Sequence, residues 1–339
     1  MASPVPDSFP HRPPRSSTEG FTLMELMVAI SVLVLLCGLV MQLMGSATRL
    51  TGNARQTADC DSQARFALSQ ISQDLARRIR RPDVDAAVCK STGDDQFYFF
   101  SETPGYAPGI SNPTDVSPVS LVGYRVTHRT NKNNLSTFQL ERCAMALPWN
   151  DNVGGIRSLP FVALDRFRQP IPSTTLGGVD GKGNGGTFEG LLSGNTSQQV
   201  YFQELASNVL RFEVALLLKP GIYLADPQNP SPAPPPAEVA QLPPRLMTDA
   251  EMHRELARHG FTRIAAVVVS LAVVDSRSMA QVGMESLLSV SKSLVDAQPT
   301  SYPRLPIDAW NETFQAQSAG WPKPVAAGLR FYQRIIQLH

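Results

Sequence analysis

One carboxylate, Glu25, lies near the start of a long apolar run that covers residues 20–44. From Phe21 to Met44 the only other polar side chains are Thr22, Ser31, Cys37 and Gln42. A carboxylate at the centre of a membrane helix costs about 2.5–3.5 kcal/mol on insertion scales, and its cost nearer the edge is smaller but still unfavourable. The presence of Glu25 in this run therefore requires an explanation. One explanation is an interfacial residue of a plain signal anchor, which reaches the lipid headgroups.

The sequence offers little for enzyme chemistry. The histidines include no pair at the His-Glu-x-x-His spacing, and there is no Gly-x-Ser-x-Gly elbow, Rossmann fingerprint or EF-hand loop. The glycines of residues 181–186 lack the Gly-Lys-Ser/Thr ending of a phosphate loop, so a surface loop is expected there. We therefore expect no enzyme activity and no catalytic, cofactor-binding or metal-binding residues.

The four cysteines occupy different parts of the chain, and no pair has metal-ligand spacing. Cys37 lies in the apolar run and Cys60 in a predicted helix, whereas Cys89 and Cys143 fall in the region after it. Outside the cytoplasm, Cys89 and Cys143 either form a disulfide or remain two separate buried thiols. Sequence spacing leaves both alternatives open.

The near-neutral charge argues against a nucleic-acid partner. The 339 residues carry 30 Lys and Arg, 29 Asp and Glu, and a formal net charge of +1. Phosphate recognition requires a concentrated basic face. The basic cluster at residues 77–81 is the exception, and we interpret it as the complement of the dipole at the end of a helix.

The apolar run is long enough to cross a membrane once. About 20 apolar residues at 1.5 Å each span a hydrocarbon core of roughly 30 Å. A secretory signal peptide would have an apolar core of about 7–15 residues followed by a small-x-small cleavage site, which does not fit this run. Residues 1–20 are polar and rich in Pro and Ser, which is typical of disordered sequence.

Residues 20–26, Gly-Phe-Thr-Leu-Met-Glu-Leu, resemble the processing motif of type IV pilins and type II secretion pseudopilins. The resemblance implies a leader at residues 1–20, cleavage after Gly20 by a membrane-embedded prepilin peptidase, and N-methylation of the new terminus at Phe21. It also implies that Glu25 pairs with the N-terminus of a neighbouring subunit during filament assembly. Two features depart from the family pattern: Glu19 replaces the usual basic residue, and the leader is long.

The elements that follow are typical of a long helix and a β-rich head. Residues 45–81 repeat apolar side chains at three- to four-residue spacing, which predicts that one helix covers 21–81 and ends before Pro82. Strands are expected at 96–100, 120–128, 138–144, 209–218, 264–274 and 329–337. A Gly-rich loop at 177–194 and an extended or disordered Pro-rich loop at 226–244 interrupt them, and Thr248 with Glu251 predicts a capping box for a helix at 248–259.

These observations predict an α+β, pilin-like fold in which the second half of the helix packs on an antiparallel β-sheet head at residues 82–339. The chain is similar to J-type minor pseudopilins and, more narrowly, to the Verru_Chthon cassette protein C family. The resemblance implies a structural subunit of a pilus or secretion filament, with the prepilin peptidase, other pilin or pseudopilin subunits and inner-membrane lipid as partners. The head would lie in the periplasm, or at a filament tip or the cell surface after assembly. The alternative is a monomeric signal-anchored envelope or binding protein that never polymerises.

Overall fold

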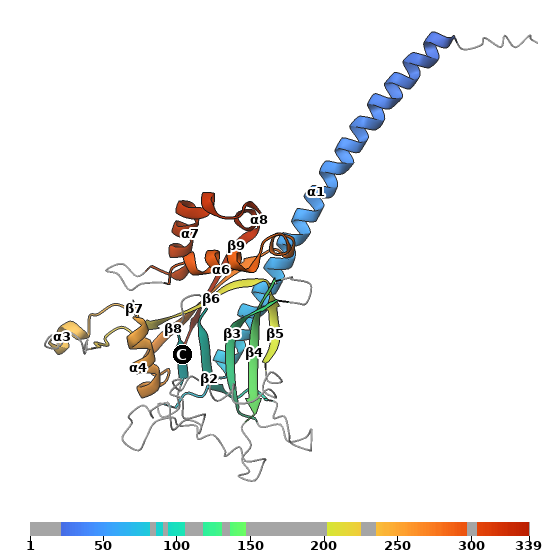
Figure 1. Ribbon diagram of the computed structural model, residues 1–339. Coiled ribbons are helices and arrows are strands. Elements are labelled where there is room, and N and C mark those ends of the chain that lie inside the picture. The colour runs from blue at the N-terminus through green and yellow to red at the C-terminus, as the bar shows by residue number, and fades with distance from the viewer. Residues whose placement is uncertain are drawn as a thin grey trace, which may run out of the picture. The chain divides into compact units, whose positions relative to one another are not determined.

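The computed structural model describes residues 22–81, 86–90, 94–105, 118–130, 136–146, 202–224, 235–296 and 304–338 (Figure 1). Gly20, Phe21 and the Gly-rich segment 177–194 lie outside these residues. The chain divides into two compact units, residues 1–55 and 56–339, and the helix α1 (Leu23–Ala76) continues through the boundary between them. The fold is α+β: one long N-terminal helix, antiparallel sheets and a set of shorter helices.

The N-terminal half of α1 is apolar and exposed. Large hydrophobic side chains from Leu23 to Leu50 are at least 49% exposed, so the described residues of this chain leave them largely uncovered. Among the described residues, α1 is the one helix long and apolar enough to cross a membrane, and it lies near the N-terminus. This agrees with the predicted span.

Helix α1 ends at Ala76, five residues before the predicted end at Arg81. After Ala76 the backbone leaves the helix and pairs with the next strand: Arg78 forms an isolated bridge with Ser101, and the Ile79 N–H donates to the Phe100 carbonyl at 3.0 Å. The basic residues 77–81 therefore follow the last turn instead of forming it. Arg78 still complements the end of the helix, because its Nη1 donates to the Leu75 carbonyl at 3.1 Å. Its guanidinium also lies over the Phe261 ring, 5.7 Å from the centroid.

The residues after α1 form two antiparallel sheets rather than the single sheet expected from the sequence. The first has the order β1-β2-β3-β4-β5 and the second the order β7-β6-β8-β9. The first sheet comprises β1 (Ala86–Cys89), β2 (Gln96–Ser101), β3 (Ser120–Thr130), β4 (Ser136–Ala146) and β5 (Phe202–Ser207). The second comprises β7 (Arg245–Leu246), β6 (Val209–Leu218), β8 (Ile264–Val274) and β9 (Leu329–Gln337).

The chain passes from one sheet to the other at Asn208. This residue separates β5 from β6 and is the only non-glycine residue with positive φ in the described part of the chain, at 58°. Asn tolerates the left-handed region better than most residues because its short polar side chain bonds locally; here the amide of Asn208 donates to Ser276 Oγ at 2.8 Å. A single residue in the left-handed conformation thus connects β5 of the first sheet to β6 of the second.

The main core lies between α1 and both sheets. Ala64, Leu68 and Ile71 of α1 are buried in one apolar cluster with Phe97 and Phe99 of β2 and with inward residues of β6 and β8. In β8 this face is supplied by Val267, Val269, Leu271 and Val273. Alternate residues of the strands therefore pack against residues three to four apart on the helix, as the sequence predicted.

The opposite face of the second sheet is covered by C-terminal helices that the sequence analysis did not predict. They are α5 (Ser276–Ala280), α6 (Met284–Ser293), α7 (Pro306–Gln317), the 3-10 turn η2 (Ser318–Gly320) and α8 (Lys323–Gly328). Trp310 of α7 is fully buried in a second cluster with Ala272 and Val274 of β8 and packs on Phe331 of β9 at 5.6 Å. Figure 1 shows α6, α7 and α8 gathered on one side of the head.

Two further helices flank the second sheet. α4 (Asp249–His259) confirms the predicted capping box: Thr248 Oγ1 accepts from the Glu251 N–H at 3.2 Å, and Glu251 Oε2 accepts from the Thr248 N–H at 2.9 Å. α3 (Pro236–Val239) lies in the segment expected to be extended or disordered. Proline at the first helical position explains this turn, because its missing N–H needs no partner there.

The strand order is not compatible with a disulfide between Cys89 and Cys143. Cys89 ends β1 and Cys143 lies in β4, with β2 and β3 between them. Three strand spacings of about 4.8 Å separate the two backbones by about 14 Å. A disulfide requires Cα atoms about 4.4–6.8 Å apart, so of the two alternatives the disulfide does not fit this topology, and Cys143 is a free thiol.

Candidate functional site

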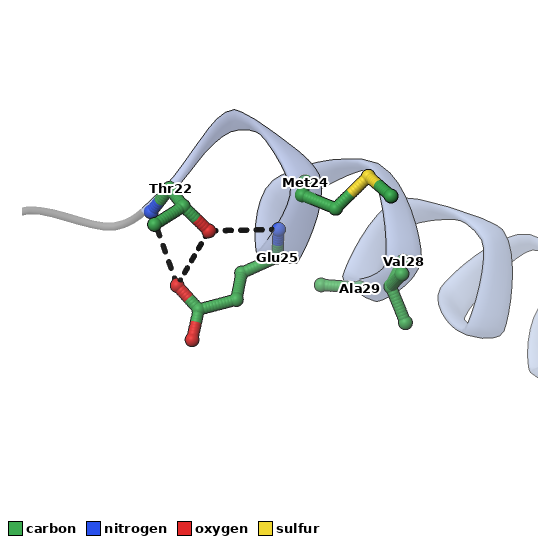
Figure 2. Close-up of a pocket in the computed structure, with 5 residues that line it drawn as sticks. All are labelled: Thr22, Met24, Glu25, Val28 and Ala29. Carbon is green, nitrogen blue, oxygen red and sulfur yellow. Dashed lines mark hydrogen bonds between the residues drawn. The ribbon is translucent and has the colours of Figure 1, made fainter.

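The candidate functional site is the start of α1, where Thr22 and Glu25 form a reciprocal capping box (Figure 2). The Glu25 N–H donates to Thr22 Oγ1 at 3.3 Å, and Glu25 Oε2 accepts from the Thr22 N–H and from the Thr22 hydroxyl, each at 3.0 Å. Thr22 satisfies one of the orphan N–H groups of the helix start, and the negative charge of Glu25 is favourable at the positive end of the dipole.

Only one of the two Glu25 carboxylate oxygens takes part in this capping box. Both bonds to the carboxylate end on Oε2, and in Figure 2 the other oxygen, Oε1, points away from the helix. The side chain lies at an open hollow lined by Thr22, Met24, Glu25, Val28 and Ala29. A carboxylate placed in this way keeps an oxygen available for a cation outside its own chain.

Glu25 was predicted from the sequence as a functional residue, whereas its partner Thr22 was not. The signal was present, because Thr-x-x-Glu before an apolar run is the sequence signature of a capping box. The other two predicted processing residues, Gly20 and Phe21, lie outside the described residues, so the structure places Glu25 alone of the three.

The head contains a buried polar cluster around Asp74, in the last turn of α1. Arg142 of β4 binds its carboxylate with two hydrogen bonds, Nε to Oδ2 at 2.6 Å and Nη2 to Oδ1 at 3.0 Å. Tyr124 of β3 donates to Oδ2, and Thr103 and Gln70 donate to Oδ1 at 3.3 and 3.2 Å. Burial, together with the Asp74 charge, raises the pKa of Tyr124 well above its usual value. The cluster attaches α1 to the first sheet.

A second buried cluster, around Asp95, joins the two sheets. Asp95 is fully buried before β2; its Oδ2 accepts from Lys90 Nζ at 2.6 Å and from the Val214 N–H of β6 at 2.8 Å. Glu213 Oε1 lies 3.8 Å from the same Lys90. Burial raises the pKa of Asp95 to about 6, although Lys90 and the Val214 N–H act in the opposite direction.

Both buried clusters connect elements of the fold. Within the described part of the chain, no group of three or more His, Cys, Asp or Glu side chains is arranged to hold a metal ion. His128 pairs with Asp94 at 2.9 Å and packs on Phe138, which gives it a structural partner. The contacts of Asp74 and Asp95 hold the helix and sheets together, and they leave the start of α1 as the candidate site.

Comparison of the chain with protein families, with curated proteins and with solved structures finds no match.

Proposed function

We propose that this protein is a minor pilin- or pseudopilin-like structural subunit of a type IV pilus or a type II secretion-like filament. In this proposal α1 inserts into the bacterial inner membrane, a prepilin peptidase cleaves after Gly20, and the processed chain assembles with other subunits through α1. The head lies in the periplasm until assembly carries it to a filament. A minor role suits the head, because bulky insertions pack poorly in a uniform helical lattice.

One observation carries the proposal: three structural features occur in a single helix. Its first turn holds the carboxylate of Glu25, its apolar half from Leu23 to Leu50 is exposed, and its second half supplies core residues of the head. A plain anchor requires only the apolar half. An exposed helix that is continuous with the head core is suited to packing against other copies or partners while it displays the head.

Glu25 would pair with the α-amino group of Phe21 from a neighbouring processed subunit. The capping bonds to Thr22 fix Oε2 at the helix start, and Oε1 is left for the incoming ammonium group. In lipid such a pair lowers the cost of the carboxylate, so Glu25 would favour the assembled state over the single chain.

The first test is the N-terminal residue and mass of membrane-extracted protein, with and without a co-expressed prepilin peptidase. We expect loss of residues 1–20 and a terminus at Phe21, with or without a methyl group. Gly20→Leu should block processing, whereas Gly52→Leu is the matched control, because a Cβ atom at position 52 meets nothing within 4 Å. An intact Met1 terminus in the native host, despite an active peptidase, would contradict the proposal.

The second candidate is a monomeric signal-anchored envelope or binding protein. The capping box favours it, because Thr22 already gives Glu25 a partner within its own chain. The two candidates differ in their response to Glu25→Ala. In a filament subunit this variant should still be processed but should be lost from cross-linked assemblies, and Glu25→Gln, which keeps the size but not the charge, should behave in the same way. A monomeric anchored protein should be indifferent to both changes.

A further inference from the structure

Strand β9 is the outer strand of the second sheet, and its free edge is long. It pairs with β8 through nine consecutive residues, from Leu329 opposite Val274 to Gln337 opposite Ala266. The sheet order β7-β6-β8-β9 places no further strand beside it among the described residues. A nine-residue outer edge exceeds the usual strand length of about five to six residues, and such an edge is a template for another strand.

The register shows which backbone groups face outward. The Leu338 N–H donates to the Ala265 carbonyl at 2.8 Å, so even-numbered residues of β9 form the hydrogen-bonded pairs with β8. The N–H and C=O groups of Phe331, Gln333, Ile335 and Gln337 therefore point away from the sheet. No hydrogen bond within the described residues reaches these eight groups.

The exposed side chains along this edge include two arginines on one face of the strand and an isoleucine on the other. Arg330 and Arg334 are exposed and lie four residues apart on the face that contains Tyr332. Within the described chain neither arginine has a carboxylate at ion-pair distance; Arg330 donates only to the carbonyls of Ala327 and Leu329, at 3.0 and 2.8 Å. On the opposite face Ile335 is 48% exposed.

We propose that β9 binds an extended acidic segment of a partner protein by strand addition. The partner would place two carboxylates, four residues apart, opposite Arg330 and Arg334, and an apolar side chain opposite Ile335. Opposite charges on facing strands stabilise the pair, and like charges destabilise it. A second copy of β9 would bring another pair of arginines to the same edge, which makes an acidic strand the better occupant.

The test uses the full chain in detergent and fluorescent seven-residue peptides, with binding measured by anisotropy at low salt. The first peptide, Thr-Val-Glu-Thr-Val-Val-Glu, carries the two carboxylates at the required spacing. The second replaces both glutamates by lysine, and the third carries N-methyl groups at the residues that would donate to β9. We expect the first peptide to bind at least about tenfold more tightly than either of the others.

Charge reversal identifies the site. The double variant Arg330→Glu and Arg334→Glu should lose the acidic peptide and gain the lysine peptide, whereas Arg65→Glu, at an exposed arginine of α1, should change neither. Unchanged circular dichroism of the variants excludes misfolding as the cause. Equal binding of the glutamate and lysine peptides, or no binding of any peptide, would overturn the proposal. So would concentration-dependent self-association that Ile335→Pro abolishes, because it would make a second copy the occupant.

Discussion

At the scale of single residues, the largest energetic effect is expected from Asp74. Its carboxylate accepts hydrogen bonds from Arg142 and Tyr124. Removal of the carboxylate would leave these two side chains without their acceptor inside the protein. Breaking a buried pair by removing one partner costs about 3–5 kcal/mol. Asp74→Ala should therefore lower the free energy of unfolding by about that amount, measured by urea unfolding followed by circular dichroism.

The neighbouring exposed residue provides the control for Asp74. Gln73→Ala, one position earlier on α1, should change the free energy of unfolding by less than about 0.5 kcal/mol. The double variant Asp74→Ala and Arg142→Ala should recover part of the loss, since it no longer leaves an unpaired guanidinium. If the double variant is as unstable as the sum of the two single variants, the pair is not coupled.

Asp95 predicts a pH dependence with an unusual sign. Burial raises its pKa to about 6 from an ordinary value of 3.8, so between these pH values the folded state binds more protons than the unfolded state. This group therefore stabilises the fold below about pH 4, and its contribution is lost as the pH rises through 6. Asp94 acts in the same direction, because burial also raises its pKa.

Asp95→Asn isolates this contribution. The variant keeps an oxygen for the Val214 N–H but does not titrate, so its stability should fall less than that of the natural chain between pH 4 and 7. The difference should be on the order of 1–3 kcal/mol, read from urea unfolding at several pH values. Parallel pH profiles for the two proteins would show that Asp95 does not have a raised pKa.

At the scale of elements, the junction between α8 and β9 depends on a glycine. A Cβ at Gly328 would lie 1.8 Å from Oδ2 of Asp275 and 2.6 Å from Oγ of Ser278. Asp275 caps α5 by accepting the Ser278 N–H at 2.9 Å, so a side chain at 328 would displace the cap. Loss of a cap costs about 0.5–2 kcal/mol, and overpacking about 1–3 kcal/mol.

Gly328→Ala should accordingly lower the free energy of unfolding by about 1–4 kcal/mol. Gly320→Ala is the matched control, since a side chain there meets nothing within 4 Å. Thermal unfolding by circular dichroism compares the two variants. An unchanged transition for Gly328→Ala would mean that the Asp275 side chain moves aside without loss.

Elements with strong local signals could be predicted from the sequence. β6, β8 and β9 begin and end at the predicted residues, because runs of β-branched and aromatic side chains are bounded there by Asn208, Asp275 and Gly328. β1 has four residues and β7 has two, too few for a periodic pattern. The helices α5 to α8 were not predicted; α5 and α8 have only five and six residues, and proline at the start of α7 and α8 is a usable signal.

Long-range partnerships could not be predicted. Arg142 is 68 residues from Asp74, and Val214 is 119 residues from Asp95, so neither contact can be predicted from a local sequence pattern. Glu25 was found because a charge in an apolar run is visible from composition alone, and its partner Thr22 is only three residues away. The passage from the first sheet to the second lies at Asn208, whose left-handed conformation the sequence does not reveal.

At the scale of the whole molecule, the boundary between the two units predicts where the chain can be shortened. The unit that begins at Gln56 retains Cys60, Ala64, Ala67, Leu68, Ile71 and Leu75, the α1 residues of the core. The exposed apolar side chains from Leu23 to Leu50 belong to the part removed. A chain that begins at Gln56 should therefore fold as a soluble head.

A chain that begins at Arg77 should not fold. It lacks the α1 residues of the core, among which Leu68, Ile71 and Leu75 alone contribute about 1.5–3 kcal/mol each by burial. It also lacks Asp74, so Arg142 and Tyr124 lose their acceptor. These losses together approach the whole net stability of a typical domain, about 5–15 kcal/mol.

Size-exclusion chromatography and thermal unfolding should give a monomer with a cooperative transition for the Gln56 chain and an aggregate for the Arg77 chain. Aggregation of both would show that the head depends on the helix before residue 56, and α1 would then be a structural part of the head along its whole length rather than an anchor joined to it.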